Sequence, residues 1–170
     1  MNRIDLVKSL KLKGNGIEIG VQQGKFSKRI LENSDLHLYL VDAWRNQSDY
    51  NDSANVCDVA HLAKMITTIA SLQEYEGRFT VIREFSSRAA KMFANNFFDF
   101  IYIDANHSYQ EVKNDIKNWF PKLKCGGTIA GHDYVKDDSV FQVKKAVDEF
   151  FGKNIVKTTS ERFPSWYITP

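Results

Sequence analysis

The 170-residue chain is poor in cysteine and proline and carries almost no net charge, and each scarcity excludes a class of protein. Its two cysteines, Cys57 and Cys125, lie far apart in the sequence, which predicts reduced thiols and no disulfide framework. The 23 Lys and Arg against 21 Asp and Glu leave a formal charge of +2, too small to predict a nucleic-acid or membrane surface. We therefore expect a cytoplasmic protein whose partner is a small molecule.

Long apolar runs and repeats are also missing. No stretch reaches the length that spans a membrane, and charged side chains interrupt the first 16 residues, where a signal peptide would have its apolar core. Hydrophobic residues make up 43% and charged residues 26% of the chain, which are ordinary globular values. With only 9 Gly and 3 Pro and no linker, the sequence predicts one domain over residues 1–170, whose residues 1–13 contain an N-terminal helix.

Short β-branched or aromatic runs alternate with segments of helical period, a pattern typical of parallel strands joined by helices. The predicted strands are Gly16–Val21, Leu36–Asp42, Phe79–Glu84, Phe98–Asp104, Gly127–Gly131, Ile155–Thr159 and Ser165–Thr169. Only the Glu161–Pro164 turn separates the last two, so we expect an antiparallel hairpin at the sheet edge. The predicted fold class is α/β: a Rossmann-like, doubly wound, mostly parallel seven-stranded sheet with an antiparallel C-terminal hairpin.

Capping residues and amphipathic stripes predict the helices. Ser108 and Glu111 match a capping box, as do Ser139 and Gln142. A third helix is predicted by the apolar stripe of Val56, Val59, Ala63, Ile66 and Ile69. We expect these helices to turn their apolar stripes toward the core.

Ligands of an open parallel sheet bind beyond the carboxyl ends of its strands. The first predicted strand leads into Gly20-x-x-x-Gly24, where glycines permit a tight turn and a close approach to a ligand. This spacing lacks the GxGxxG of dinucleotide-binding proteins, which disfavours a dehydrogenase. Asp42 ends the second strand, 18 residues beyond Gly24, and its carboxylate can accept hydrogen bonds from both hydroxyls of a ribose.

Aromatic and hydroxyl side chains follow the second and third strands. Trp44 either covers an adenine or packs in the core. Phe85 and Ser86 offer a ring edge and a hydroxyl where an adenine would lie, although Ser86 or Ser87 could equally cap a helix.

Carboxylates and imidazoles follow the fourth and fifth strands. Asp104 and His107 come after the fourth strand, and His132 and Asp133 come after the fifth. Buried acids and imidazoles are costly unless they are paired or used, so their convergence predicts a reactive site. We predict that Asp104, His107 and Asp133 are the catalytic residues.

These motifs together resemble those of the class I S-adenosylmethionine-dependent methyltransferases over nearly the whole chain. The segments Ile103–Tyr109 and Ala130–Tyr134 look more closely like those of small bacterial methyltransferases related to the catechol-type and antibiotic-sugar O-methyltransferases. The resemblance implies S-adenosylmethionine as the cofactor, in an extended pose across the strand ends. The cofactor-binding residues that follow are Glu18, Gly20, Gly24, Asp42, Ala43, Trp44, Phe85, Ser86 and Asp104.

The resemblance also raises the question of a metal. In the catechol-type relatives a divalent metal lies beyond the fourth and fifth strands, and those positions fall here on Asp104, His132 and Asp133. His132 departs from that pattern, because imidazole is a poor ligand for magnesium. Two routes for removing the acceptor's proton stay open: a divalent metal, Mg or Mn, or His107 or His132 as general base. We expect the route without a metal.

The predicted function is transfer of a methyl group from S-adenosylmethionine to a hydroxyl oxygen of a sugar or another small metabolite. The alternative is a domain that binds S-adenosylmethionine or a nucleotide and has lost catalysis. A nucleic-acid methyltransferase is disfavoured because no Asn-Pro-Pro-Tyr-type motif follows the fourth strand. Acceptor selection is expected from the Arg45–Ser53 loop or from a partner subunit, as in a homodimer.

Overall fold

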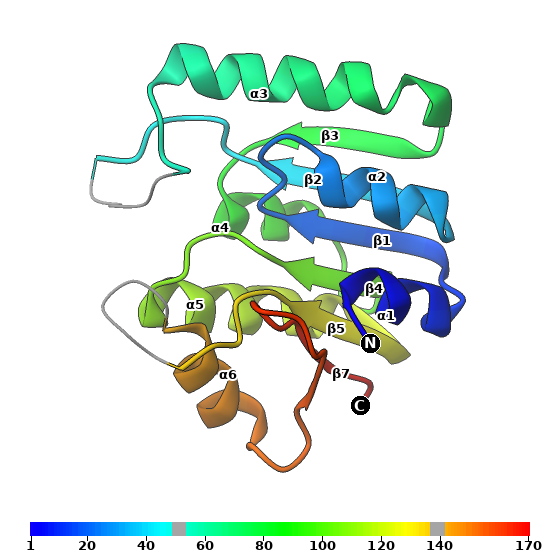
Figure 1. Cartoon of the computed structure of the whole chain (residues 1–170), viewed down its shortest axis with the longest axis vertical. Helices are drawn as coiled ribbons and strands as arrows, with labels where there is room; N and C mark the ends of the chain where they lie inside the picture. Colours follow the sequence, from blue (N-terminus) through cyan, green and yellow to red (C-terminus); the bar gives the residue numbers. More distant parts are fainter. Residues whose placement is uncertain (49–53, 137–141) are drawn as a thin grey trace.

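The computed structural model describes residues 1–48, 54–136 and 142–170 (Figure 1). Its strands are β1 (Lys13–Ile19), β2 (Asp35–Asp42), β3 (Phe79–Arg83), β4 (Phe98–Ile103), β5 (Leu123–Gly131), β6 (Lys157–Thr158) and β7 (Trp166–Ile168). They form one sheet in the order β3-β2-β1-β4-β5-β7-β6. Strands β1 to β5 pair in parallel, and β7 runs antiparallel to both β5 and β6. The predicted doubly wound sheet with an antiparallel C-terminal hairpin is confirmed.

The helices are α1 (Arg3–Leu10), α2 (Lys25–Glu32), α3 (Asp58–Ser71), α4 (Ser86–Ala89), α5 (Tyr109–Trp119) and α6 (Val143–Phe151). Side chains alternate between the two faces of a strand, and both faces of β4 are apolar. Phe100 and Tyr102 pack in a cluster with α1 and α2, whereas Ile101 and Ile103 pack with α4, α5 and α6. Helices therefore cover both faces and leave the carboxyl ends of the strands open. None of the helices within the described residues has the length and apolarity needed to span a bilayer.

Helix α5 begins at Tyr109 as expected, but the predicted capping box does not form. The Ser108 hydroxyl makes no capping bond. Instead the Gln142 side chain accepts a hydrogen bond from the Tyr109 amide at 3.1 Å, and the Asn106 side chain accepts one from the Ser108 amide at 2.9 Å. The first amide of the helix is thus bonded by Gln142, a residue distant in the sequence, and not by the predicted capping box. The second predicted box begins at Ser139, which lies outside the described residues, and α6 begins only at Val143.

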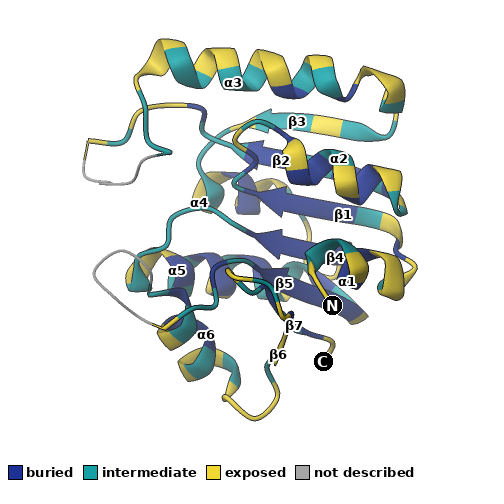
Figure 2. Ribbon diagram, viewed as in Figure 1, coloured by how far each residue is buried: buried dark blue, intermediate teal, exposed yellow. Residues whose placement is uncertain are grey.

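The apolar stripe on α3 does not face the core as predicted. Val59 is 79% exposed and Ile66 is 58% exposed, and Thr68 is the one buried residue of this helix. The Thr68 hydroxyl donates to the Gln22 carbonyl at 3.3 Å, so α3 meets the loop after β1, while much of the helix surface is exposed (Figure 2). The predicted helix is confirmed, whereas the prediction that its apolar stripe faces the core is wrong.

Candidate active site

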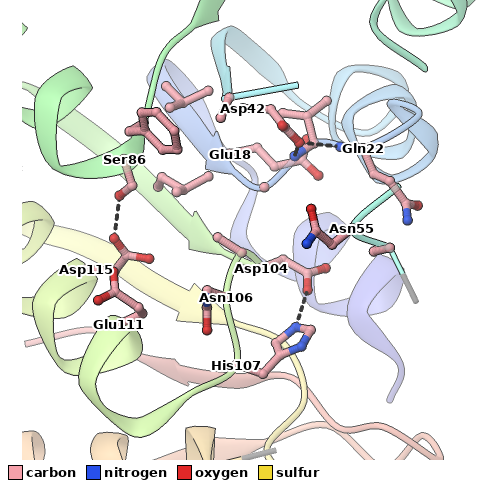
Figure 3. A pocket seen from close by; sticks show the side chains of 18 of the residues that line it. Glu18, Gln22, Asp42, Asn55, Ser86, Asp104, Asn106, His107, Glu111 and Asp115 are labelled. Atoms are coloured by element: carbon pink, nitrogen blue, oxygen red, sulfur yellow. Dashed lines mark hydrogen bonds and ion pairs between the residues drawn. The ribbon is translucent and has the colours of Figure 1, made fainter. Parts of the chain in front are cut away.

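A cavity of about 410 Å³ lies where β1 to β4 end, and Figure 3 shows the side chains that line it. The strand ends contribute Gly20–Gln23 after β1, Asp42 at the end of β2 with Ala43 after it, Phe85–Ser87 after β3, and Asp104–His107 after β4. Of the residues predicted to bind the cofactor, Glu18, Gly20, Asp42, Ala43, Phe85, Ser86 and Asp104 line this cavity. Gly24 and Trp44 are not part of its wall.

The two glycines of the first loop have different structural roles. Gly20 has φ +88°, and a Cβ there would overlap the Asp104 carbonyl and lie 2.8 Å from the Ala105 Cα. This glycine therefore lets the loop after β1 pack directly against the loop after β4. Gly24 has φ +70° and precedes the first residue of α2, where a Cβ would lie 2.7 Å from the Thr68 Cγ2. Gly24 is thus needed for the turn and for packing against α3.

Asp42 holds the loop after β1 in place. Its Oδ2 accepts hydrogen bonds from the amides of Val21 at 3.0 Å and Gln22 at 2.8 Å, and its Oδ1 accepts one from the Trp44 amide at 2.7 Å. A carboxylate has about four lone-pair positions, so acceptor capacity is left for a ligand. Sequence reasoning assigned Asp42 a ligand role alone and missed that it positions the loop.

Trp44 and Ser86 are committed to protein contacts. Trp44 is fully buried, and its Nε1 donates to the Gln22 carbonyl at 2.9 Å, so of its two predicted roles the structure places it in the core. The Ser86 hydroxyl does not cap α4: it donates to the Asp115 carboxyl and accepts from the Trp119 Nε1 at 2.8 Å. Ser86 therefore has no hydroxyl proton left for a ligand.

Two buried acids line the cavity. Burial raises the pKa of Glu18 to about 8, against the opposing hydrogen bond that the Ser27 hydroxyl donates. Burial likewise raises the pKa of Asp115 to about 7, against the bond from Ser86. Glu18 is therefore mostly neutral at pH 7. The sequence analysis did not predict a role for Asp115. Its position among Val112, Ile116 and Trp119, which repeat at helical spacing, was a signal that could have revealed a buried acid.

The structure brings the predicted reactive residues together. His107 Nε2 lies 3.0 Å from an Asp133 oxygen and 3.7 Å from an Asp104 oxygen, the second contact being drawn in Figure 3. His132 Nδ1 lies 3.3 Å from Asp133 and 3.9 Å from Asp104. Asp133 is 7% exposed and has φ +55°, in the left-handed region that residues other than glycine rarely adopt. Asp104 and His107 also line the cavity.

The charge of His107 is set by the two carboxylates. Burial alone would lower the pKa of the imidazole, but the hydrogen bonds and charges of Asp104 and Asp133 outweigh burial and raise the pKa of His107 to about 10. In the opposite sense, burial would raise the pKa of Asp133, but both imidazoles hold it well below its usual range. At pH 7 an imidazolium therefore lies between two carboxylates.

The same cluster has the donors for a metal ion. Asp104, His107 and Asp133 each offer a ligand atom within 4.8 Å of the others. This set contains His107 where the sequence predicted His132, because His107 Nε2 approaches both carboxylates more closely. Mixed carboxylate and imidazole donors fit Mn²⁺ or Zn²⁺ better than Mg²⁺. A metal there would have to replace the His107 proton, since only the neutral imidazole has a lone pair to donate.

Comparison with known proteins identifies the family. A family model described as a methyltransferase domain matches residues 17–134. Among curated proteins none matches the chain. An O-methyltransferase from Bacillus cereus, solved in complex with S-adenosylhomocysteine, has a similar fold: the TM-score is 0.70, the identity is 12%, and the match covers 98% of this chain and 78% of that one.

A second solved structure has the same fold. It is an rRNA methylase from Streptococcus thermophilus, with a TM-score of 0.64, 12% identity, and a match over 98% of this chain and 93% of that one. The two neighbours carry different activities, so at this identity they establish the fold and not the acceptor. The cavity at the strand ends, the seven-stranded sheet and the match over residues 17–134 lead to one conclusion: the chain belongs to the family of methyltransferase domains and has the class I fold that its sequence resembles.

Proposed function

We propose that the protein transfers a methyl group from S-adenosylmethionine to a hydroxyl oxygen of a small molecule. One observation carries the proposal: a single cavity extends from Phe85 and Asp42 to the cluster of Asp104 and His107. A cofactor stretched along it has its ribose near Asp42 and its sulfonium near Asp104. The Bacillus cereus neighbour, with S-adenosylhomocysteine bound, supports this choice of ligand.

The protein's own residues can supply the remaining requirements of an in-line methyl transfer. The acceptor oxygen must be aligned with the methyl carbon, so that the C–O bond forms as the C–S bond breaks and S-adenosylhomocysteine leaves, and the hydroxyl proton must pass to a base. The neutral His107 imidazole is the base that we assign to this step, with Asp133 orienting the ring at 3.0 Å. Because the sulfonium of the bound cofactor adds a positive charge near Asp104, cofactor binding lowers the pKa of His107 and makes its neutral form more accessible.

A metal ion at Asp104, His107 and Asp133 would supply a Lewis acid that lowers the pKa of a bound acceptor hydroxyl. The charged imidazole already balances the two carboxylates, so we propose that methyl transfer does not require this ion. Turnover that survives a chelator and is lost in His107→Gln supports the base route. Loss on chelation with recovery in Mn²⁺ or Mg²⁺ contradicts it.

A small acceptor is supported by the charge of the cavity wall. Glu84, Glu111 and Asp104 all line it, and carboxylates there would repel a phosphate backbone. The two exposed thiols, Cys57 and Cys125, fit the reducing cytoplasm that we propose as the location. The Arg45–Ser53 loop falls partly outside the described residues, so its part in acceptor selection stays a prediction, as does that of a partner subunit.

The first test is ligand binding. Calorimetry with S-adenosylhomocysteine, with NAD as the comparison ligand, is expected to show binding of the first and none of the second. Binding of NAD alone would contradict the proposed cofactor. Turnover with a panel of sugars and phenols then separates an enzyme from a domain that binds the cofactor and has lost catalysis.

A further inference from the structure

Helix α1 brings Arg3 to the cavity from a part of the sequence that contains none of the motifs. Leu6 and Val7 of this helix are buried, and the Arg3 amide donates to the Glu161 Oε1 at 2.9 Å. Glu161 lies between β6 and β7 and also accepts a hydrogen bond from the Thr159 hydroxyl at 3.0 Å. The position of Arg3 is therefore fixed by core packing and by the C-terminal hairpin.

The Arg3 guanidinium is held by neighbouring side chains that do not occupy all of its hydrogen-bond donors. Its carbon lies 4.6 Å from the centre of the Phe26 ring, and its Nη1 lies 3.6 Å from an Asp104 oxygen. The second distance is that of an ion pair longer than a hydrogen bond. The guanidinium also hydrogen-bonds with the Tyr102 hydroxyl. Arginine has five N–H donors in a planar fork, so the contacts with Tyr102 and Asp104 leave further donors for a ligand in the cavity.

The charges that line the cavity are unevenly distributed. Among the described residues of its wall, the Lys and Arg side chains are those of Arg3, which lies over the Phe26 ring, and of Lys25, which precedes Phe26 in the sequence. The acids Glu84, Glu111 and Asp115 belong to the wall near Ser86. Asp104 lies 3.6 Å from Arg3, but its charge is shared with the His107 imidazolium, 3.7 Å away. Glu18, the buried acid nearest in sequence to Lys25, is mostly neutral at pH 7 because burial raises its pKa to about 8. An anionic group of a ligand is therefore favoured at the Arg3 end.

We infer that Arg3 binds the carboxylate at the amino-acid end of the cofactor. The inference rests on the proposed function, because S-adenosylmethionine has a carboxylate at one end and an adenine at the other. With its ribose at Asp42 and its sulfur at Asp104, the amino-acid end reaches the part of the wall formed by Gly20, Phe26 and Arg3. A guanidinium fork can bind such a carboxylate through two parallel hydrogen bonds.

Three ligands separate this role from a structural one. S-adenosylhomocysteine has the carboxylate, 5′-deoxy-5′-(3-aminopropylthio)adenosine lacks only the carboxylate, and 5′-methylthioadenosine lacks the whole amino-acid end. Their dissociation constants are measured by calorimetry for the wild type, Arg3→Met and Arg3→Lys. Arg29→Met is the matched control, since Arg29 is an exposed cation on α2 that pairs with Glu32 and does not line the cavity.

We expect Arg3→Met to weaken S-adenosylhomocysteine binding by ~10-fold or more, the effect of losing a charge-assisted pair. The same variant should bind each of the two ligands without a carboxylate within about twofold of the wild type, and Arg29→Met should leave all three affinities unchanged. Arg3→Lys should fall between, because an ammonium keeps the charge and loses the fork.

Two results would overturn the role of Arg3. An equal loss for all three ligands would mean that Arg3 only maintains the cavity, and an unchanged affinity for S-adenosylhomocysteine would mean that Arg3 binds nothing there. If Arg3→Met does not fold, the selective loss has to appear in Arg3→Lys, and its absence there would overturn the role equally. A wild-type protein that binds none of the three ligands would refute the proposed function itself.

Discussion

Replacing Gly20 by alanine tests how the loops after β1 and β4 fit together. Two costs apply. An L-residue at φ +88° costs ~1–2 kcal/mol, and overlap of the new methyl with the Asp104 carbonyl costs a further ~1–3 kcal/mol, because both partners are backbone and neither can rotate away. The free energy of unfolding should therefore fall by ~2–5 kcal/mol.

Gly77 provides a matched control for this change. Its φ is +81°, and a Cβ there would meet nothing within 4 Å, so Gly77→Ala carries the conformational cost alone. Both variants are unfolded in urea, and their free energies of unfolding are compared provided that their m-values are equal. The extra loss of Gly20→Ala over Gly77→Ala is the cost of the overlap, expected at ~1–3 kcal/mol. Gly20→Ala should also weaken S-adenosylhomocysteine binding, since this glycine lines the cavity. Equal destabilisation of the two variants would refute the close approach of the loops.

Three further predictions concern charged groups. Asp42→Asn removes a carboxylate that accepts hydrogen bonds from backbone amides, so urea unfolding without cofactor should show a free energy of unfolding lower by ~1–3 kcal/mol. A variant with wild-type stability and weaker binding of S-adenosylhomocysteine would show that Asp42 does not hold the loop. The pKa of His107 is raised from 6.5 to about 10 in the folded protein, so its contribution to the free energy of unfolding is complete below pH 6.5 and is lost as the pH rises through 10. Urea unfolding across that window should show the wild type losing stability relative to His107→Gln, and parallel curves would contradict the ion pair. The pKa of Asp115 is raised from 3.8 to about 7, so as the pH rises this carboxyl ionises first in the unfolded state. The wild type should therefore lose stability relative to Asp115→Asn between pH 3.8 and 7, and the difference should be constant above pH 7. Thermal melts that show no such relative change would contradict the burial of this carboxyl.

The sequence was sufficient for those features that depend on local pattern. Alternating strand and helix periods gave the order of the elements, and a hairpin too short for a crossover helix gave the antiparallel edge. Parallel strands end at one edge of the sheet, so acids and imidazoles that follow neighbouring strands had to converge. Asp104, His107 and Asp133 meet for this reason.

Only the tertiary structure decided which partner each side chain meets. Trp44 packs in one buried cluster with side chains of α2 and β2, and the apolar stripe of α3 is exposed at Val59 and Ile66. Gln142 bonds to the first amide of α5 in place of Ser108, through a contact between segments distant in the chain. Arg3 precedes the first strand and belongs to no motif, yet the packing of α1 brings it to the cavity. Such contacts join residues far apart in sequence, and no period or spacing along the chain encodes them.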